Sequence, residues 1–593
     1  MEIDDIKIPN SNDPHRDMEN YGFFIEKGRY YTLETRGKKT NKKQLSTFVM
    51  KSVFHLIDGT DDTLRIIFIK RHNEEKDFIE VRSSEMKPEA FETKLKSKSC
   101  TFLGTSLELK LVFSYLMDNE EKANLISLIG WNNEFKVFAF ADSVFSSSGL
   151  YKTDSLGIVE TDKEKFYLPA FSYANLLNED YKTQRLYKFM PGKTDFKAWS
   201  SLFFQAYGKN GLIQILFTIS AVFRDVIFDQ IGFFPFLFLF GDAGTGKTQS
   251  VEKLLRLFGS DVIGTSLNNA TTPGLSRITA QKSNCLVYLK EYTNETEGNI
   301  QDFILTAYDG AGRTIGLKTT DSRTKTHSIK SGLVFDGNHL PTQKTAILMR
   351  MILLIFESNN FSDEQTKAYH ELKELSDHGF GNVFIEILRL RPHFENNFRE
   401  KYLQVKTKLR KENTDQIPER MTEHISMLFT VWEITKDHLI YPFTVNQLES
   451  ILKENAEGHN TILKENSSIY VFWESFSHNV SKGFIEQYNK ELTNEKRSHF
   501  RIVPQTENEA ILQIRYKEIY QYYLRFCKEN GIKYLDKSSL LKILTSEANT
   551  SFIKTNQKDR GRGYTDFVFG FCYQFKVEYS TNKFSINDVD VFL

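Results

Sequence analysis

One segment of eight residues constrains this chain more than any other: Gly241-Asp-Ala-Gly-Thr-Gly-Lys-Thr248. An apolar run precedes it at 236–240, and a helical pattern follows it, with apolar residues at helical spacing among charged ones. A strand, a glycine-rich loop and a helix in this order are the context that a G-x-x-x-x-G-K-[ST] phosphate loop requires. A fortuitous glycine-rich turn is the alternative. The segment predicts an α/β domain with a phosphate site after a buried strand.

The residue types in this loop suit a nucleoside triphosphate. Backbone N–H groups of the glycines curl around a phosphate, and the helix N-terminus adds a partial positive charge. Lys247 is expected to reach the β- and γ-phosphates, and Thr248 is expected to bind Mg²⁺. We therefore expect ATP and Mg²⁺ as cofactors, bound by the whole segment: Gly241, Asp242, Ala243, Gly244, Thr245, Gly246, Lys247 and Thr248.

Length and pattern divide the chain into several domains. Its 593 residues are enough for three or four of them. Strand-like segments precede Pro191-Gly-Lys193, and helix and strand alternate after it. The expected fold class is multidomain α/β: a polar tail at 1–20, an α+β domain at 21–193, an ATPase core of three layers at 194–357, a helical lid and linker at 358–506, and a C-terminal domain at 507–593.

The N-terminal region is expected to be α+β, with no motif that we can assign to chemistry. An assembly or scaffolding role is the favoured interpretation. Its expected elements are a hairpin at 21–33 that turns at Lys27-Gly28, strands at 47–57, 63–69, 78–81 and 135–140, and helices at 88–96 and 107–117.

Composition limits the partners and the compartment. The formal net charge is zero, so any nucleic-acid binding must come from local basic patches. The four cysteines lie far apart with no C-x-x-C, which argues against a zinc site or a disulfide framework and fits a reducing cytoplasm. The apolar stretch at 211–240 is interrupted by charged residues and a proline, so we expect a buried helix and strand there rather than a membrane span.

The first strand downstream of the loop ends in two charged residues. An apolar run at 285–289 is followed by Lys290 and Glu291, about 44 residues after Lys247, where a P-loop ATPase carries its second acidic motif. Glu291 is the candidate to orient the attacking water and to contribute to the metal site, and a solvent-facing strand-end Glu is the alternative. Lys290 stands where an Asp usually helps to hold Mg²⁺, and a lysine cannot ligate Mg²⁺. Either Thr248 and Glu291 hold the metal through water, or hydrolysis is weak.

A second strand, Gly332–Asn338, ends in a polar amide. Asn338 is a candidate to contact the γ-phosphate or the water, and the alternative is that it only caps the turn before Pro341. Arg350 precedes the apolar run 351–356 and is a candidate arginine finger for a neighbouring subunit, the alternative being a structural ion pair. The predicted catalytic set is Lys247, Glu291, Asn338 and Arg350.

Taken in order, the phosphate loop, Leu289-Lys-Glu291, Phe335-Asp-Gly-Asn338 and Met349-Arg350 resemble the set found in AAA+ helicases of the presensor-1 hairpin group. Over about 194–450 the chain looks similar to the MCM-like replicative helicases of staphylococcal chromosome cassettes and pathogenicity islands. The resemblance implies a hexameric ring with ATP at the subunit interfaces and single-stranded DNA in the pore. It also implies 3′→5′ translocation, replication of a mobile genetic element and a bacterial cytoplasm.

In that family a β-hairpin before the Asn strand projects into the pore, and the segment 314–330 stands in the matching place. The resemblance implies that Lys318, Arg323 and Lys325 follow DNA phosphates, and a solvated loop is the alternative. Arg420 resembles the second sensor arginine that touches ATP, and an ordinary exposed helix arginine is the alternative.

The last segment, 507–593, predicts a winged helix, a helix-turn-helix variant whose hairpin also contacts duplex DNA. Its expected elements are helices at 514–527 and 537–546 and strands at 551–556 and 565–577. The loop between the strands carries the candidate DNA contacts Lys558, Arg560 and Arg562, and a solvated hairpin tip is the alternative.

Two functions are compatible with these patterns. The first is an ATP-driven DNA helicase, which uses the complete set of hydrolysis residues. The second is an origin-binding initiator in which ATP is an assembly switch and hydrolysis is slow, and Lys290 favours it. A small-molecule kinase does not explain an inter-subunit arginine, a basic hairpin and a winged helix together. No primase carboxylate cluster is present, so we predict no primer synthesis.

Overall fold

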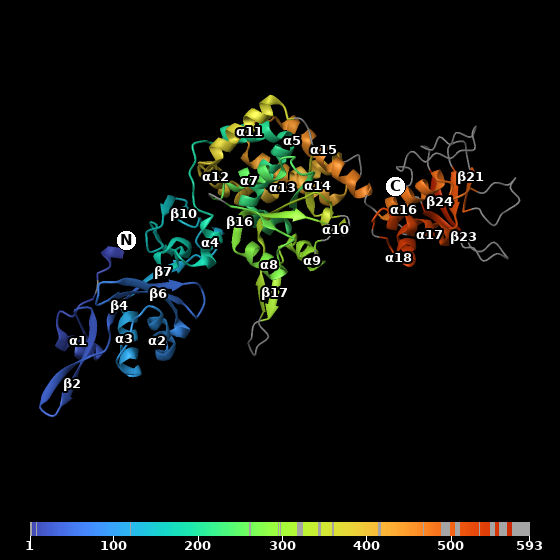
Figure 1. Cartoon of the computed structure of the whole chain (residues 1–593). Helices are drawn as coiled ribbons and strands as arrows, with labels where there is room; N and C mark the ends of the chain where they lie inside the picture. Colours follow the sequence, from blue (N-terminus) through green and yellow to red (C-terminus); the bar gives the residue numbers. More distant parts are fainter. Residues whose placement is uncertain are drawn as a thin grey trace.

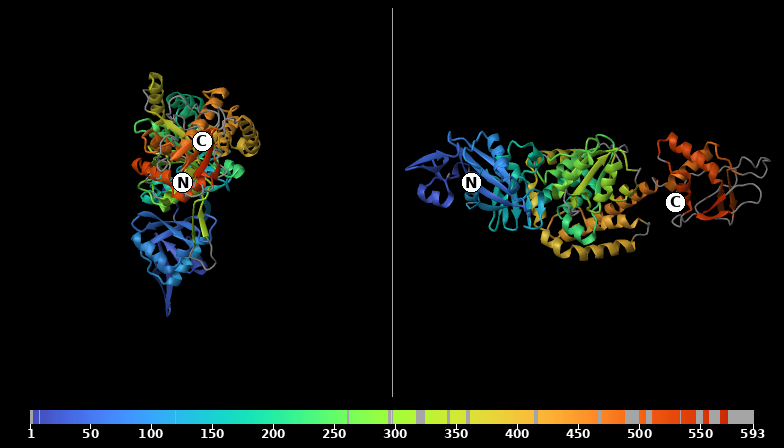
Figure 2. Two further views of the ribbon diagram at one scale, coloured as in Figure 1. Left: turned by 90° about the vertical axis from the view of Figure 1, so that its right-hand side faces the viewer. Right: turned by 90° about the horizontal axis from the view of Figure 1, so that it is seen from below.

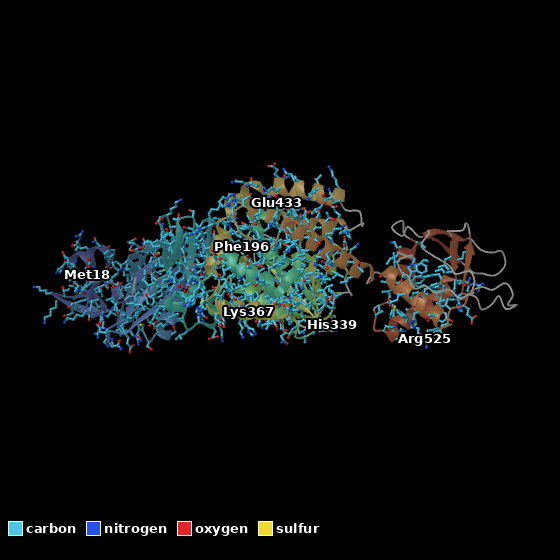
Figure 3. The ribbon with its side chains drawn as sticks, turned by 90° about the horizontal axis from the view of Figure 1, so that it is seen from above. Met18, Phe196, His339, Lys367, Glu433 and Arg525 are labelled. Carbon is cyan, nitrogen blue, oxygen red and sulfur yellow. The ribbon has the colours of Figure 1, made fainter. Side chains whose placement is uncertain are left out.

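The computed structural model describes residues 3–571, except 8, 119, 260–261, 294–295, 297, 317–323, 342–344, 358–360, 413–416, 466–467, 488–498, 505–509, 533, 546–551 and 557–565. Figures 1 and 2 show three bodies that follow one another along the chain: blue N-terminal, green to gold central, and orange-red C-terminal. Figure 3 labels one or more residues in each of them: Met18 in the first, Phe196, His339, Lys367 and Glu433 in the second, and Arg525 in the third.

The N-terminal body is built on a six-stranded sheet of order β12-β13-β7-β4-β5-β6. One face packs on two helices through residues such as Phe91 and Phe113, and the other face forms a second apolar cluster that includes Phe68 and Leu156. The elements are β4 (Phe48–Ile57), β5 (Leu64–Arg71), β6 (Lys76–Arg82), α2 (Pro88–Ser97), α3 (Ser106–Asp118), β7 (Glu121–Leu125), β12 (Ile158–Glu160) and β13 (Lys165–Tyr167). They confirm the strands and helices predicted between 47 and 117.

A smaller sheet of β1 (Phe24–Glu26), β2 (Arg29–Arg36) and β3 (Lys39–Gln44) precedes the larger one. The turn between β1 and β2 has Lys27 and Gly28 at φ 49° and 69°, which confirms the predicted hairpin. The tail expected at 1–20 contains helix α1 (Pro14–Tyr21). This helix forms because Asp13 caps its first turn and Pro14 presets its first dihedral angle.

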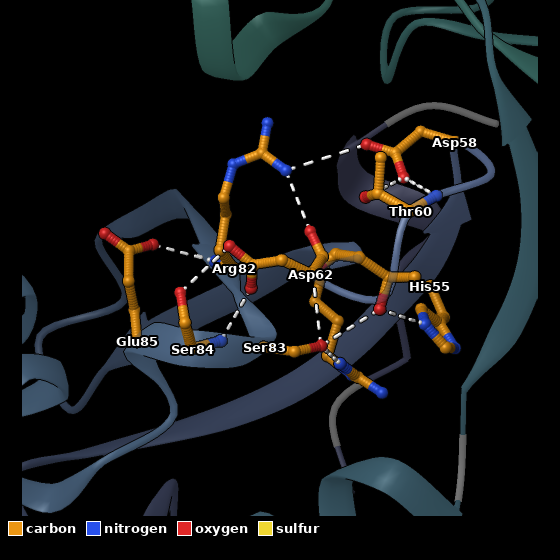
Figure 4. A network of polar contacts seen from close by, with 10 residues as sticks. His55, Asp58, Thr60, Asp62, Arg82, Ser83, Ser84 and Glu85 are labelled. Carbon is orange, nitrogen blue, oxygen red and sulfur yellow. Dashed lines mark hydrogen bonds and ion pairs between the residues drawn. The ribbon is translucent and has the colours of Figure 1, made fainter. Parts of the chain in front are cut away.

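A polar network lies where β4 and β6 end and β5 begins (Figure 4). Thr63 Oγ1 lies 2.7 Å from His55 Nε2 and 2.9 Å from Ser83 Oγ. The buried guanidinium of Arg65 donates to Ser83 Oγ at 2.8 Å and to both carboxylate oxygens of Glu120, at 2.9 and 3.2 Å. All these partners belong to the same body, so the network serves to join its strands.

The central body contains a nine-stranded sheet of order β11-β10-β9-β8-β16-β19-β14-β20, with β15 paired to β16. The pairs among β14, β15, β16, β19 and β20 are parallel, so the carboxyl ends of these strands meet at one edge. The strands are β8 (Ile129–Asn132), β9 (Val137–Ala139), β10 (Ser143–Ser146), β11 (Gly149–Lys152), β14 (Phe236–Gly241), β15 (Thr265–Ser266), β16 (Lys282–Tyr292), β19 (Lys330–Gly337) and β20 (Met351–Phe356).

This sheet crosses the domain boundary that we expected at Pro191–Lys193. β8 pairs in parallel with β16, where Ile129 lies opposite Lys282, and β9, β10 and β11 continue outward from it. Phe138 of β9 packs on Phe384, with ring centroids 4.6 Å apart. The strands from β8 to β11 therefore share the sheet and the core of the central body.

Helices cover both faces of the central sheet, which gives the three expected layers (Figure 1). Along β14, Leu237 and Leu239 face one apolar cluster, whereas Phe236 and Phe238 face the other. The helices that precede the lid are α4 (Lys182–Arg185), α5 (Phe196–Val222), α6 (Arg224–Ile231), α7 (Lys247–Leu255), α8 (Thr272–Ala280), α9 (Gly298–Ala307) and α10 (Thr345–Leu348). Within the described residues no single helix is long and apolar enough to span a membrane, and α5 and α6 meet that test only as a pair bent by 84°.

The region predicted as helical lid and linker at 358–506 is helical between 363 and 481, whereas 500–504 form a strand of the C-terminal body. The helices are α11 (Asp363–Ser376), α12 (Gly381–Leu388), α13 (Arg391–Glu412), α14 (Glu419–Thr435), α15 (Val445–Glu465) and α16 (Ser468–Ser481). Arg391, the first residue of α13, links this helix to the core of the central body. Its guanidinium donates to both carboxylate oxygens of Asp225 and lies 3.7 Å from the centroid of the Trp131 ring. The start of α13 is thereby joined to both α6 and β8.

The C-terminal body has the predicted two helices and two strands, together with a strand pair that we did not predict. Its elements are β21 (Phe500–Pro504), β22 (Ala510–Ile514), α17 (Tyr516–Glu529), α18 (Lys537–Leu544), β23 (Phe552–Asn556) and β24 (Asp566–Phe571). The strands form one sheet of order β21-β22-β24-β23. Trp473 of α16, Tyr523 and Leu540 belong to the apolar cluster of this body.

Candidate active site

The phosphate loop lies between β14 and α7, as the sequence predicted. Gly241 has φ 151°, and a Cβ atom there would lie 2.1 Å from the Phe356 carbonyl oxygen, so only glycine fits. Gly246 has φ 90° and precedes α7 without a side-chain cap. The three residues before Thr245 are exposed. The loop therefore places exposed residues beside an uncapped helix N-terminus, which is an arrangement that binds phosphate.

Lys247 is folded back across the loop. Its ammonium donates to the carbonyl oxygens of Gly241 and Asp242, at 2.5 and 2.6 Å. Burial lowers the pKa of Lys247, and the negative charges of Asp336 and Asp242 oppose that effect. The ammonium thus lies inside the loop, where it can bind phosphate oxygens.

Asn338 is brought to the loop from the end of β19. Its Oδ1 accepts a hydrogen bond from Lys247 Nζ at 3.3 Å, across 91 residues of sequence. β19 lies between β14 and β16 in the sheet, so the residues that follow β14 and β19 are neighbours. The structure therefore places Asn338 where it can contact what Lys247 contacts.

Glu291 lies within a bulge near the end of β16. The register with β19 shifts between Leu289 and Tyr292, and Glu291 has φ 63°. A positive φ is rare for a residue with a side chain and re-aims it. The Glu291 carboxylate is exposed and accepts from Ser266 Oγ at 2.7 Å. This contact is with β15, on the side of β16 opposite β19 and the phosphate loop, so the exposed Glu291 carboxylate is not brought to Lys247 as Asn338 is.

Lys290 does not face the loop carbonyls. Its Nζ lies 3.6 Å from Glu252 Oε1 on α7 and 5.3 Å from the centroid of the Tyr288 ring. Both partners are about a quarter to a third exposed, so this ion pair contributes little stability. The Lys290 side chain is thus directed to α7, and the carboxylate that contacts Thr248 belongs to a side chain of another strand.

That side chain is Asp336 of β19, for which we predicted no role from the sequence. Its Oδ2 accepts from Thr248 Oγ1 at 3.3 Å and from the Tyr288 hydroxyl at 2.7 Å, and its Oδ1 accepts from the Glu291 N–H at 2.8 Å. Burial and the nearby Asp336 carboxylate raise the pKa of Tyr288, which keeps its hydroxyl a donor. The signal available in the sequence was a carboxylate two residues before Asn338, directly after the apolar run 333–335.

The two candidate arginines lie together, but at the opposite end of the strands. Met351 pairs with Phe236 at the start of β14, and Arg350 directly precedes it. The guanidinium carbons of Arg350 and Arg420 each lie 5.4 Å from the centroid of the same Tyr308 ring. Arg350 also donates to the Ala346 carbonyl at 2.9 Å, and among the described residues its Nε has no hydrogen-bond partner.

The candidate DNA contacts are placed only in part. β17 (Arg313–Gly316) and β18 (Thr324–His327) form an antiparallel hairpin that projects from the central body (Figure 1). The backbone of Lys325 lies in β18, whereas Lys318 and Arg323 lie outside the described residues. Lys558, Arg560 and Arg562 also lie outside them.

Within the described residues, no group of three or more His, Cys, Asp or Glu side chains is placed to hold a metal ion. Mg²⁺ commonly takes one or two protein oxygens and completes its coordination with phosphate oxygens and water. The residues that could contribute are Thr248 and Asp336, with Glu291 at the edge of the site.

No protein-family profile and no curated protein matches the chain. Solved structures do match it. Cch of SCCmec type IV, an active helicase, has a TM-score of 0.58 and 14% sequence identity, and the match covers 92% of this chain and 97% of that one. The chain shares the Cch fold. A match to the C-terminal region of NrS-1 has 12% identity, covers 88% and 96% of the two chains and has a TM-score of 0.31, which is too low to support an argument.

Proposed function

We propose that this chain is an ATP-dependent DNA helicase that acts as a ring in replication initiation of a mobile genetic element, with 3′→5′ translocation. The observation that carries the proposal is the 3.3 Å contact between Lys247 Nζ and Asn338 Oδ1. It joins the phosphate loop to the strand end that would detect a γ-phosphate. The full-length similarity in fold to the Cch helicase supports the same class of activity.

Each residue around the loop has a role in this proposal. ATP is cradled by the backbone of the loop, with the Lys247 ammonium on its terminal phosphates. The Thr248 hydroxyl would help to hold Mg²⁺, which would supply positive charge to the phosphates. Glu291 orients the attacking water, and Asn338 holds either that water or the γ-phosphate. The open helix N-terminus before α7 supplies further positive potential.

Arg350 and Arg420 act on the nucleotide of a neighbouring subunit. Arg350 lies beside the start of β14, whereas the phosphate loop follows the end of β14. The whole length of β14 therefore separates the arginines from the phosphate loop of their own subunit. Their shared position at Tyr308 gives one cationic patch rather than two unrelated arginines. In a ring, such a patch completes the site of the adjacent subunit, which is the arrangement of an arginine finger.

DNA contact is assigned to two parts of the chain. The β17–β18 hairpin carries Lys318, Arg323 and Lys325 toward single-stranded DNA in the pore. The C-terminal body acts as a winged helix, with Lys558, Arg560 and Arg562 on the duplex. Contacts of this kind bind phosphates, so binding weakens as salt rises and depends little on base sequence.

One observation favours a second function. Lys290 stands where an acidic residue is expected, and it pairs with Glu252 instead. If the site binds ATP but hydrolyses it poorly, the chain is an initiator in which ATP controls assembly on DNA and a motor in another chain opens the duplex.

DNA-stimulated ATP hydrolysis tests the proposal. Lys247→Ala and Asn338→Ala are expected to abolish hydrolysis, whereas His339→Ala is the matched control, because His339 is exposed beside Asn338 and is given no role. A wild-type chain that binds ATP but does not hydrolyse it would favour the initiator. Equal activity in the wild type and in Asn338→Ala would remove the role of Asn338.

A further inference from the structure

In this chain the carboxylate that contacts Thr248 is Asp336 of β19. A P-loop ATPase usually carries that carboxylate on the second acidic strand, which here ends in Lys290. In that arrangement Mg²⁺ is held by the loop Thr and by an Asp on the second acidic strand. Here the corresponding strand is β16, and Lys290 is directed to Glu252 on α7. The carboxylate that contacts the Thr248 hydroxyl comes from β19, the next strand of the sheet.

From these contacts we infer that Asp336 supplies the protein carboxylate of the Mg²⁺ site, in place of an acidic residue at 290. This inference rests on the proposed function, because it assumes that the loop binds Mg²⁺ with ATP. It deepens that proposal by naming a metal residue that lies on a different strand from the usual one.

The Asp336 carboxylate is buried and surrounded by hydrogen-bond donors. The residue is only 6% exposed, and burial of a carboxylate is costly unless hydrogen bonds or a cation compensate it. Three donors surround it: the hydroxyls of Thr248 and Tyr288, and the Glu291 N–H. The positive charge of Lys247 is also close enough to interact with it.

The same hydrogen bonds connect the metal residue to the water-orienting residue. Asp336 Oδ1 accepts from the backbone of Glu291, and Oδ2 accepts from Thr248. Asp336 therefore spans from the metal side of the site to the bulge that aims Glu291. Lys290 is compatible with Mg²⁺ binding at such a site, because Asp336 on β19 supplies the negative charge that an acidic residue at position 290 of β16 would have supplied.

Nucleotide binding measured with and without Mg²⁺ tests the inference without relying on hydrolysis. The full chain is titrated with a fluorescent ATP analogue in EDTA and again in Mg²⁺. The wild type is expected to bind more tightly with Mg²⁺. In Asp336→Asn, which keeps the size of the side chain, that gain is expected to fall by about 10- to 100-fold. Affinity in EDTA is expected to stay at or above the wild-type value, because a negative charge has been removed.

A change of metal preference separates metal binding from a purely structural role. In Asp336→Cys, Mg²⁺ is expected to lose its effect on nucleotide affinity, whereas Cd²⁺ is expected to produce one, because thiolates prefer soft cations. Asp336→Ser is the matched control: it lacks the thiol but keeps the other cysteines, and Cd²⁺ is expected to have no effect on it.

The outcomes distinguish the two levels of the argument. A wild-type chain whose affinity for ATP does not respond to Mg²⁺ would overturn the proposed function together with the inference. A wild-type response that persists unchanged in Asp336→Asn, or a Cd²⁺ effect of equal size in the Cys and Ser variants, would overturn the inference alone. Thermal unfolding of each variant without nucleotide verifies that it is folded before titration.

Discussion

Arg350 is predicted to complete the active site of a neighbour and not its own. Arg350 precedes the start of β20, where Met351 lies opposite Phe236, whereas the phosphate loop follows the far end of β14 at Gly241. Strand residues rise by about 3.3 Å each, so β14 alone separates the two by roughly 17 Å. That distance exceeds the reach of one arginine side chain. Arg350→Ala is therefore expected to lower hydrolysis by about 10³-fold, as the loss of an arginine finger does.

Mixing two inactive variants tests the direction of this contribution. Lys247→Ala removes the phosphate-binding lysine, and Arg350→Ala removes the finger. In a ring formed at random from equal amounts of both, a complete interface needs an intact Lys247 on one subunit and an intact Arg350 on the next. This occurs at about one interface in four, so hydrolysis should recover to about a quarter of the wild-type rate.

The assay measures phosphate release at constant total protein, after the subunits have been mixed and allowed to exchange. Each variant alone is the baseline, and Arg399→Ala is the matched control, because Arg399 is exposed on α13 and is given no role. If Arg350 served its own subunit, no subunit in the mixture would be complete, and activity would stay at the baseline. That result, in rings shown to contain both variants, would refute the assignment in trans.

Two further predictions concern stability. Burial lowers the pKa of His424 to about 3 and that of His459 to about 4, well below the unfolded value of about 6.5, so the stability from their neutral forms is present above pH 6.5 and is lost below it, by about 1.4 kcal/mol per pH unit for each group. Calorimetry from pH 7.5 to 5 is expected to show this loss, reduced in His459→Asn, and an equal slope in both proteins would contradict it. Asp225→Ala leaves the buried Arg391 without its main partner and is expected to cost about 3 kcal/mol by urea unfolding. Glu454→Ala, which breaks the exposed pair with Lys209, should cost less than about 1 kcal/mol, and equal effects would refute this explanation.

The sequence predicted the structure best where a continuous apolar run is followed by a glycine-rich loop. The strand Phe236–Gly241 and the helix from Lys247 appear as predicted, because a strand covered on both faces must be apolar throughout. The polar ends of β16 and β19 were also placed, because parallel strands end at one edge of the sheet. This pattern was enough to bring Asn338 to Lys247.

The sequence pattern could not predict which distant segments pair as neighbouring strands. The strands from β8 to β11 are short, and the partner of Ile129 is Lys282, more than 150 residues later, so nothing local revealed that they extend the central sheet. The same applies to β22, which pairs with β24. Asp336 was missed because its role depends on Lys290 turning toward α7, which is a tertiary contact.

The most direct test of the central claim is ATP-dependent unwinding of a forked DNA duplex by the wild-type chain, with Lys247→Ala and Glu291→Gln beside it. We predict unwinding by the wild type and none by either variant, with both variants still folded. A wild-type chain that binds ATP and DNA but neither hydrolyses ATP nor separates the strands would contradict the helicase assignment. The chain would then be an initiator switched by ATP.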